Sequence, residues 1–395
     1  MNTVLRDRYA IVGVGQSRIG EVEGSTALGL MMEASLAAMQ DAGVSKADID
    51  GIVCRGPDDM YGFHQQLGQL LGIDVGFSTT LDNGGASQIL SIILAISAIE
   101  AGLCNTVLCG YARDAWSRTH SSEEARMSQR ASGAAVGRDA RDIYSSETFG
   151  LFGAPAMHAF GARRHMDLYG TTKEQLGAVA VAFREHANRN PLAQMHSKKL
   201  TLEDYLTGRP IVEPFNLYDC SLRTDAAGAV IVTSTERAKD LQKVPVHIGG
   251  FGTHNNVSGW FHDENMVNTA AIQSSKKAYS MAGLGPKDID VFEVYDCFTY
   301  MALVQFEDYG FCIKGEGGPF VESGALSIGG ALPTNTAGGQ LSEGHAEGML
   351  QIVEAVRQAR HDYGPDRQVK DAEVVMVSGH GGNTVCHSSL ILKSA

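Results

Sequence analysis

Apolar residues along this chain follow two periodicities. Compact apolar runs at 9–15, 106–110 and 374–379 are typical of buried strands. Residues 26–42 place apolar side chains at helical spacing, and Gly43 follows them as a C-cap. Strands that alternate with helices predict an α/β fold whose mainly parallel sheets are covered on both faces.

The chain is organised around residues 80–102. Asn83, Gly84 and Gly85 are turn residues, and residues 86–99 after them are apolar or small, without a charge. A helix that is hydrophobic all round belongs in a core, and this one is too short and serine-rich to span a bilayer. Its beginning would favour a thiolate or an oxyanion, yet no strong nucleophile is present. A glycine turn before a core helix is the simpler interpretation.

An internal repeat indicates a duplicated domain. Residues 42–50, AGVSKADID, recur as residues 282–290, AGLGPKDID, and each copy lies between a helical pattern and a β-rich run. We therefore predict two halves and an insertion that covers the core: residues 1–112 with 217–245, residues 246–395, and residues 113–216. The insertion is richer in charge and contains a predicted helix at 169–188, capped by Thr171 or Thr172.

Composition excludes several classes of function. The 395 residues carry a net charge of −13, which disfavours nucleic acid and membrane surfaces as partners. The seven cysteines form no CxxC pair and predict reduced, buried thiols, with neither disulfides nor a metal site. No signal peptide or membrane span is evident, so we expect a cytoplasmic protein.

Several segments together resemble the thiolase superfamily, most closely its sterol-carrier-protein type, also called lipid-transfer protein. They are MHAFGARRHMDLYGTT, FREHANRNPLAQ and LTLEDYLTGRPIVEPFNLYDCSLRTDAAGAVIV. The resemblance covers essentially the whole chain. It implies a thiolase-like five-layered αβαβα fold made of two duplicated halves, and a homodimer with active sites near its interface.

The catalytic pattern of that family is only partly retained. Gly85 stands at the position of the nucleophilic cysteine, and Gly379 at that of the acid/base cysteine. Cys297 matches a position that is not a nucleophile, and Ser87 has no adjacent base in the sequence. Without a thiolate to carry the acyl group, the thiolase route is closed.

The retained residues suit a retro-aldol cleavage, which needs a base, oxyanion stabilisation and a proton, but no acyl acceptor. Tyr295 occupies the oxyanion-organising position, and His345 keeps the family's histidine. His345 or His380 would tune the pKa of Tyr295, while Glu343 is either a carboxylate base or a loop residue. Each histidine, and Tyr295, also has a purely structural interpretation. We expect the substrate to contact Gly85, Ser87, Asp296, Gly344, Gly379 and Gly381.

The cysteine loss together with Tyr295 resembles the bacterial steroid side-chain aldolases. That resemblance implies a β-hydroxyacyl-CoA substrate and a small partner protein with a zinc ribbon and an OB-fold. It implies no cofactor, with zinc only in the partner. Glu343 departs from the group, whose members can carry tyrosine there. Two alternatives stay open: a non-catalytic lipid or acyl-CoA carrier, and a subunit of an acyltransferase complex.

Overall fold

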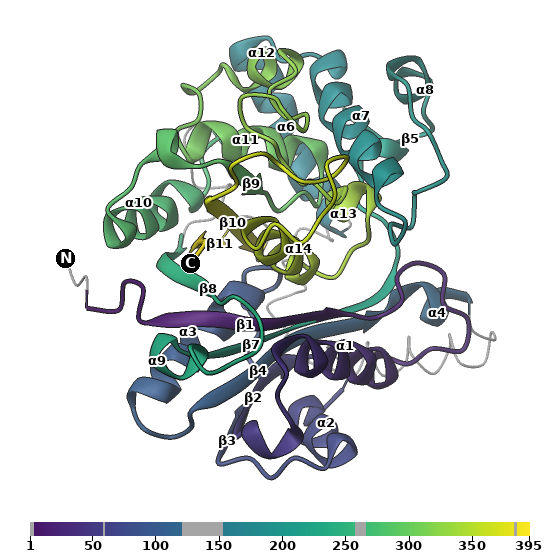
Figure 1. The fold of residues 1–395 in the computed structure, drawn as a ribbon. Coiled ribbons are helices and arrows are strands. Elements are labelled where there is room, and N and C mark those ends of the chain that lie inside the picture. Colours follow the sequence, from purple (N-terminus) through teal and green to yellow (C-terminus); the bar gives the residue numbers. More distant parts are fainter. Residues whose placement is uncertain (1–3, 58–59, 121–152, 257–265, 383–384) are drawn as a thin grey trace.

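The computed structural model describes residues 4–57, 60–120, 153–256, 266–382 and 385–395. Within them, nine strands form one mixed sheet with the order β3-β2-β4-β7-β1-β8-β11-β10-β9 (Figure 1). The bounds of these strands are β1 (Tyr9–Gln16), β2 (Gly51–Arg55), β3 (Phe77–Thr79), β4 (Thr106–Asp114), β7 (Asp225–Ser234), β8 (Val246–Asn255), β9 (Val291–Glu293), β10 (Val374–Gly381) and β11 (Cys386–Lys393). A separate hairpin pairs β5 (Pro210–Val212) with β6 (Phe215–Asn216).

The pairing pattern occurs twice, which confirms the predicted duplication. β2 pairs parallel with β4, and β4–β7 and β7–β1 follow antiparallel. Likewise β9 pairs parallel with β10, and β10–β11 and β11–β8 follow antiparallel. The two halves join where β1 meets β8, through the pairs Ala10–His247 and Ile11–Val246. The prediction of mainly parallel sheets is wrong, partly because only four residues separate β10 from β11, too few for the crossover that a parallel pair needs.

The repeated AGxxxxDID segment has the same local structure in both halves. Gly43 and Gly283 end their helices with φ of 68° and 72°, a left-handed conformation that glycine adopts without strain. Asp50 and Asp290 then each accept the backbone N–H that begins a central strand, β4 or β10, at 2.8 Å. The repeat therefore fixes the connection from helix to strand. The exact bounds of the halves stay a prediction.

Three apolar clusters alternate with the two halves of the sheet, as a five-layered fold requires. One outer layer contains α1 (Ala27–Ala42) and α2 (Phe63–Leu71), and the other contains α10 (Ala271–Ala282) and α11 (Thr299–Asp308). The central layer contains α3 (Ser87–Glu100) and α14 (Met349–Ala359). Along β10, Val375 and Val377 face this central layer, whereas Met376 faces the outer one. The predicted fold class is thus confirmed.

Residues 153–206 of the insertion pack on the second half (Figure 1). It contains α6 (Gly153–Tyr169), α7 (Lys173–Arg189) and α8 (Leu202–Leu206), and α7 lies beside α11, α12 (Gly317–Glu322) and α13 (Gly339–Ser342). The helix predicted at 169–188 begins later than expected, because Tyr169 ends α6 and Thr172 caps α7. Residues 121–152 of the insertion lie outside the described residues.

Two short helices, α4 (Ala115–His120) and α9 (Thr235–Ala238), complete the order. Across the described ranges, every helix is too short or too polar to cross a bilayer. All seven cysteines are free thiols, as the sequence predicts.

Candidate active site

Tyr295 lies where the helices of the central layer begin. It follows β9, and its backbone N–H donates to Ser378 Oγ at 2.8 Å while its carbonyl oxygen accepts from Gln305 Nε2 at 2.8 Å. Ser378 in turn donates to Gln305 Oε1 at 2.6 Å. The backbone of Tyr295 is thus fixed by a strand of one half and a helix behind it.

The Tyr295 ring occupies the space that a side chain at residue 85 would need. A Cβ added at Gly85 would overlap Cε2, Cζ and the hydroxyl of Tyr295. On the α14 side, a Cβ at Gly348 would lie 3.2 Å from Tyr295 Cδ2. The ring therefore fits between two glycines, and the loss of the cysteine at position 85 and the presence of tyrosine at 295 are sterically linked.

His345 reaches this region from the loop before α14. Its backbone N–H donates to Thr224 Oγ1 at 3.0 Å, and its Nδ1 hydrogen-bonds Ser221 Oγ at 3.0 Å. The Nε2 atom is buried and has no hydrogen-bond partner among the described residues. A bound substrate is the natural partner for such a group, because an unsatisfied buried polar atom costs about 1–3 kcal/mol.

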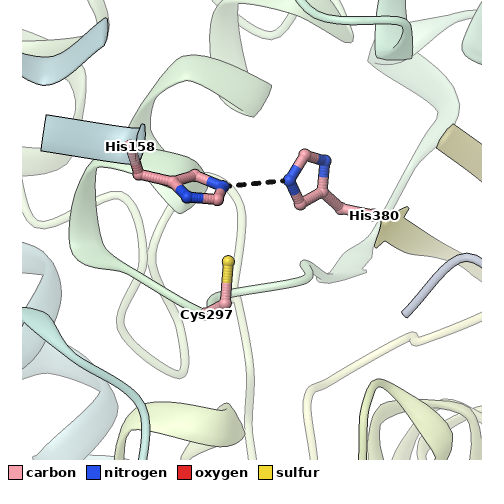
Figure 2. Close-up of side chains that lie close together, drawn as sticks. All are labelled: His158, Cys297 and His380. Atoms are coloured by element: carbon pink, nitrogen blue, oxygen red, sulfur yellow. Dashed lines mark hydrogen bonds between the residues drawn. The ribbon is translucent and has the colours of Figure 1, made fainter. Parts of the chain in front are cut away.

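His380 projects from β10 and meets His158 of α6. Their Nε2 atoms are 3.2 Å apart, and His158 Nδ1 lies 2.8 Å from the carbonyl oxygen of Ala154. Figure 2 shows the two rings edge to edge, with the Cys297 thiol pointing toward the space between them. The ring centroids of His380 and Tyr295 are 5.8 Å apart. The histidine pair is therefore adjacent to the phenol.

Burial sets the protonation states of these groups. It raises the pKa of the Tyr295 phenol well above its usual value, and the Glu347 carboxylate adds to that rise. Burial also lowers the pKa of His345 and of His380 well below the usual value. Both imidazoles are therefore neutral near pH 7, and Tyr295 keeps its proton. Neither His345 nor His380 is among the groups that shift the pKa of Tyr295, and burial has the largest effect.

The structure places two acidic residues away from the reacting groups. Both carboxylate oxygens of Asp296 are used inside the protein, with Gln340 N at 2.9 Å, Gln351 Nε2 at 3.0 Å and Leu341 N at 3.1 Å. Asp296 thus holds the α13 segment that leads to His345. Burial raises its pKa to about 7.

Glu343 belongs to a second buried network. Its Oε1 accepts from Asn190 Nδ2 at 3.3 Å, and burial together with the nearby Glu354 raises its pKa to about 8. No hydrogen bond joins it to Tyr295, His345 or His380 within the part of the chain described. Of the two roles left open for Glu343, the structure favours the loop residue.

The remaining candidates lie in closely packed turns. Ser87 Oγ accepts the backbone N–H of Asn83 at 2.7 Å, which stabilises the turn before α3. A Cβ at Gly379 would lie 2.5 Å from Ser388 Oγ, and one at Gly344 2.5 Å from Ile19 Cγ2. At Gly381 a Cβ would overlap the carbonyl oxygen of Asn83. These glycines allow close packing of the two central turns.

A basic cavity of 830 Å³ opens beside His345. Ser221, the partner of His345, lines it, together with Trp116 and Tyr218. Five cationic side chains also line it against one acidic side chain, Glu21: they are Arg184, Lys198, Lys199, Arg209 and Arg223. Such a cavity fits a ligand that carries phosphate groups at one end.

Three residues of the site escaped the sequence analysis. His158 and Ser221 come from the inserted region and its flank, and nothing in the sequence brings them near residues 380 and 345. Glu347 pairs with Arg55 and has a left-handed φ of 45°, a strained conformation for a non-glycine residue. In the sequence, the one feature that could have pointed to Glu347 as a site residue is its position two residues after His345.

The chain is similar to several known proteins. Residues 252–394 match the family model described as thiolase C-terminal domain-like. The chain is 35% identical over 369 residues to a steroid side-chain-cleaving aldolase of Thermomonospora curvata, covering 91% of this chain and 92% of the relative. It is 34% identical over 364 residues to the 17-hydroxy-3-oxo-4-pregnene-20-carboxyl-CoA lyase of Mycobacterium tuberculosis, covering 90% and 92%.

A solved structure, the Ltp2-ChsH2(DUF35) aldolase, matches with a TM-score of 0.89 and 34% identity over 99% of both chains. The fold and the relatives indicate the same group. The chain belongs to the thiolase superfamily, in its sterol-carrier-protein-type, thiolase-like branch.

Proposed function

We propose that this protein is a thiolase-like carbon–carbon lyase that cleaves a β-hydroxyacyl-CoA by a retro-aldol reaction into a ketone and a shorter acyl-CoA. One observation carries the proposal: the neutral Tyr295 phenol fills the space of the missing nucleophile beside Gly85. A site that holds a proton donor where thiolases hold a thiolate suits cleavage without an acyl-enzyme.

The three polar groups account for the proton movements. His380 takes the β-hydroxyl proton as the Cα–Cβ bond breaks and the ketone leaves with a new C=O bond. The electron pair of that bond becomes the acyl-CoA enolate, whose oxygen accepts a hydrogen bond from His345 Nε2. Tyr295 gives its proton to Cα, and the His380 imidazolium returns a proton to Tyr295. The positive charge on His380 forms beside the negative enolate, which offsets its low pKa in the free enzyme.

We infer that a hydrogen bond from the Ser221 hydroxyl gives His345 its donor role. When its hydroxyl donates to Nδ1, the single proton of the neutral imidazole lies on Nε2, the buried atom without a partner among the described residues. A neutral N–H then points at the position where charge develops, without the cost of a buried cation.

The basic cavity supplies the CoA site. Its five cationic side chains suit the phosphates of CoA, and Ser221, which lines the cavity, hydrogen-bonds His345. With CoA bound there, the thioester would lie next to the oxyanion donor, and the acyl chain would extend toward Tyr295.

The names of the relatives support a steroid as the leaving ketone. Two relatives at 35% and 34% identity are a steroid side-chain-cleaving aldolase and a pregnene carboxyl-CoA lyase. By the same argument, a partner of the DUF35 kind assembles with this chain, as the Ltp2-ChsH2(DUF35) aldolase does. We further propose that this partner carries the zinc ribbon and OB-fold implied by the resemblance, and that the lyase itself needs no cofactor.

A product assay tests the function. The protein, with its DUF35-type partner, is incubated with a steroid-17-hydroxy side-chain CoA ester and with the matched ester lacking the hydroxyl. We expect a ketone and a shorter acyl-CoA in equal amounts from the first ester and neither from the second. Tight binding of both esters without any ketone would instead support the carrier alternative.

A further inference from the structure

We propose that His158 is a positioning residue that fixes the tautomer of His380, so that His380 Nδ1 is the atom that accepts the substrate proton. This inference rests on the proposed function for its catalytic meaning. The tautomer itself is inferred from the geometry of α6 and β10. It is a property of the protein without substrate.

His158 is 3% exposed. Its Nδ1 lies 2.8 Å from the carbonyl oxygen of Ala154, one turn earlier in α6. A carbonyl oxygen only accepts, so Nδ1 must carry the proton. Burial lowers the pKa of His158 to about 4, and the ring is neutral near pH 7. Its second nitrogen, Nε2, is therefore an acceptor.

The Nε2 atom of His380 lies 3.2 Å from His158 Nε2. Two acceptors cannot share a hydrogen bond, so His380 must donate its Nε2–H to His158. Since a neutral imidazole carries one proton, His380 Nδ1 has a free lone pair. That atom is buried and has no hydrogen-bond partner among the described residues. A chain of two hydrogen bonds, from Ala154 to His380, thus leaves an unpaired base next to Tyr295.

Ring contacts hold this pair in place. His158 packs on Phe298 with a separation of 4.7 Å between the ring centroids, and Phe298 thereby supports the donor–acceptor geometry. His380 lies between Tyr295 and His387, at centroid separations of 5.8 Å and 5.9 Å. The position of the free lone pair is therefore set by packing as well as by hydrogen bonds.

The same atoms offer a competing arrangement. The ligand atoms of His158, Cys297 and His380 lie within 4.8 Å of one another (Figure 2), a spacing that a soft divalent metal accepts. A metal would require lone pairs on both Nε2 atoms and a thiolate, so it excludes the hydrogen bond between the rings. Burial raises the pKa of the Cys297 thiol well above its usual value, which favours the hydrogen-bonded pair.

Nitrogen-15 NMR of the histidine side chains reads the tautomer directly in the substrate-free enzyme. We expect a protonated Nε2 and an unprotonated Nδ1 for His380 in the wild type, and loss of this preference in His158→Ala. His158→Gln places a carboxamide oxygen near the position of Nε2 and should restore the preference. His186→Gln is the matched control, because its buried Nδ1 also meets a backbone carbonyl, that of Asn335 at 3.2 Å. The His186→Gln variant should keep the wild-type tautomer of His380 and the wild-type activity.

Turnover gives the second readout. We expect His158→Ala to lower kcat about 10²-fold with little change in KM, and His158→Gln to recover most of that loss. A wild-type His380 protonated on Nδ1, an equally active His158→Ala, or a stoichiometric metal lost on Cys297→Ala would overturn the inference. The tautomer is measured without substrate, so a failed ketone assay counts against the proposed function only.

Discussion

At the scale of single residues, the side chains at positions 85 and 295 are sterically coupled. Glycine at 85 leaves the volume that the Tyr295 ring fills, and Gly348 leaves the opposite face open. A thiolase-type cysteine at 85 and a tyrosine at 295 are therefore incompatible in this backbone. The site has exchanged a nucleophile for a phenol whose pKa burial keeps high.

Tyr295→Phe removes the phenol proton and retains the ring. We expect kcat to fall by about 10²–10⁴, the range of general acid–base assistance, while KM for the CoA ester and the melting temperature stay close to wild type. Steady-state kinetics and thermal denaturation measure both. A variant that turns over at the wild-type rate would show that the hydroxyl is structural.

Gly85→Ala adds the methyl group that overlaps the Tyr295 ring. We expect a loss of stability of about 1–3 kcal/mol from overpacking, and a loss of activity because the ring must move. Gly85→Ala in a Tyr295→Ala background should cost much less, giving a coupling free energy of at least about 1 kcal/mol in a double-mutant cycle. Strict additivity in chemical denaturation would disprove the steric link.

At the scale of elements, α7 and α14 share the buried acid network of Glu343. Its pKa is raised to about 8 in the folded protein, so the native state holds a proton that the unfolded chain releases near its usual pKa of about 4.3. Stability from this group is therefore highest at low pH and falls as pH rises from about 4 to about 8.

Glu343→Gln should remove that dependence. Relative to the variant, the wild type should lose about 2–4 kcal/mol of unfolding free energy across this pH range, measured by urea denaturation at several pH values. The difference between the two proteins isolates Glu343 from the buried histidines, whose lowered pKa values act in the opposite direction. A difference that is flat with pH would contradict the buried, protonated carboxyl.

The elements differ in how far the sequence predicted them. The repeat at 42–50 and 282–290 predicted the duplication because its turns and caps are local. The strand directions were not predictable from local pattern, since β7 pairs with β1 and β4 across more than a hundred residues. His158 and Ser221 were missed for the same reason: their partners, His380 and His345, are 222 and 124 residues away. Tyr295 and His345 could be predicted from the sequence because each lies within a short motif.

At the scale of the whole molecule, the two edges of the sheet differ. The outer edge of β9 is covered, because Phe292 pairs with Thr334 in an isolated bridge. Within the described residues, β3 (Phe77–Thr79) has no strand on its outer side. Leu81 follows β3 closely in the sequence, and the partly buried Leu81, Ile93 and Leu94 pack against the central apolar cluster. An uncovered edge beside apolar side chains suits pairing with a second copy.

We therefore expect a dimer through β3. Ser78→Lys should weaken it, since lysine on an edge strand opposes pairing, whereas Ser323→Lys on the exposed end of α12 should not. Light scattering coupled to size-exclusion chromatography distinguishes the two. A wild-type monomer with full activity at micromolar concentration would refute the proposed assembly.

The most direct test of the whole account is the dependence of ketone release on free CoA. Thiolytic cleavage consumes one CoA for each bond broken, whereas a retro-aldol cleavage distributes the atoms of one β-hydroxyacyl-CoA between two products. With a steroid β-hydroxyacyl-CoA and free CoA removed by a thiol-scavenging reagent, we predict ketone and short acyl-CoA in a one-to-one ratio at an unchanged rate, with no acyl-enzyme in the intact mass spectrum. A reaction that stops without CoA, or a covalent acyl adduct on the protein, would contradict it.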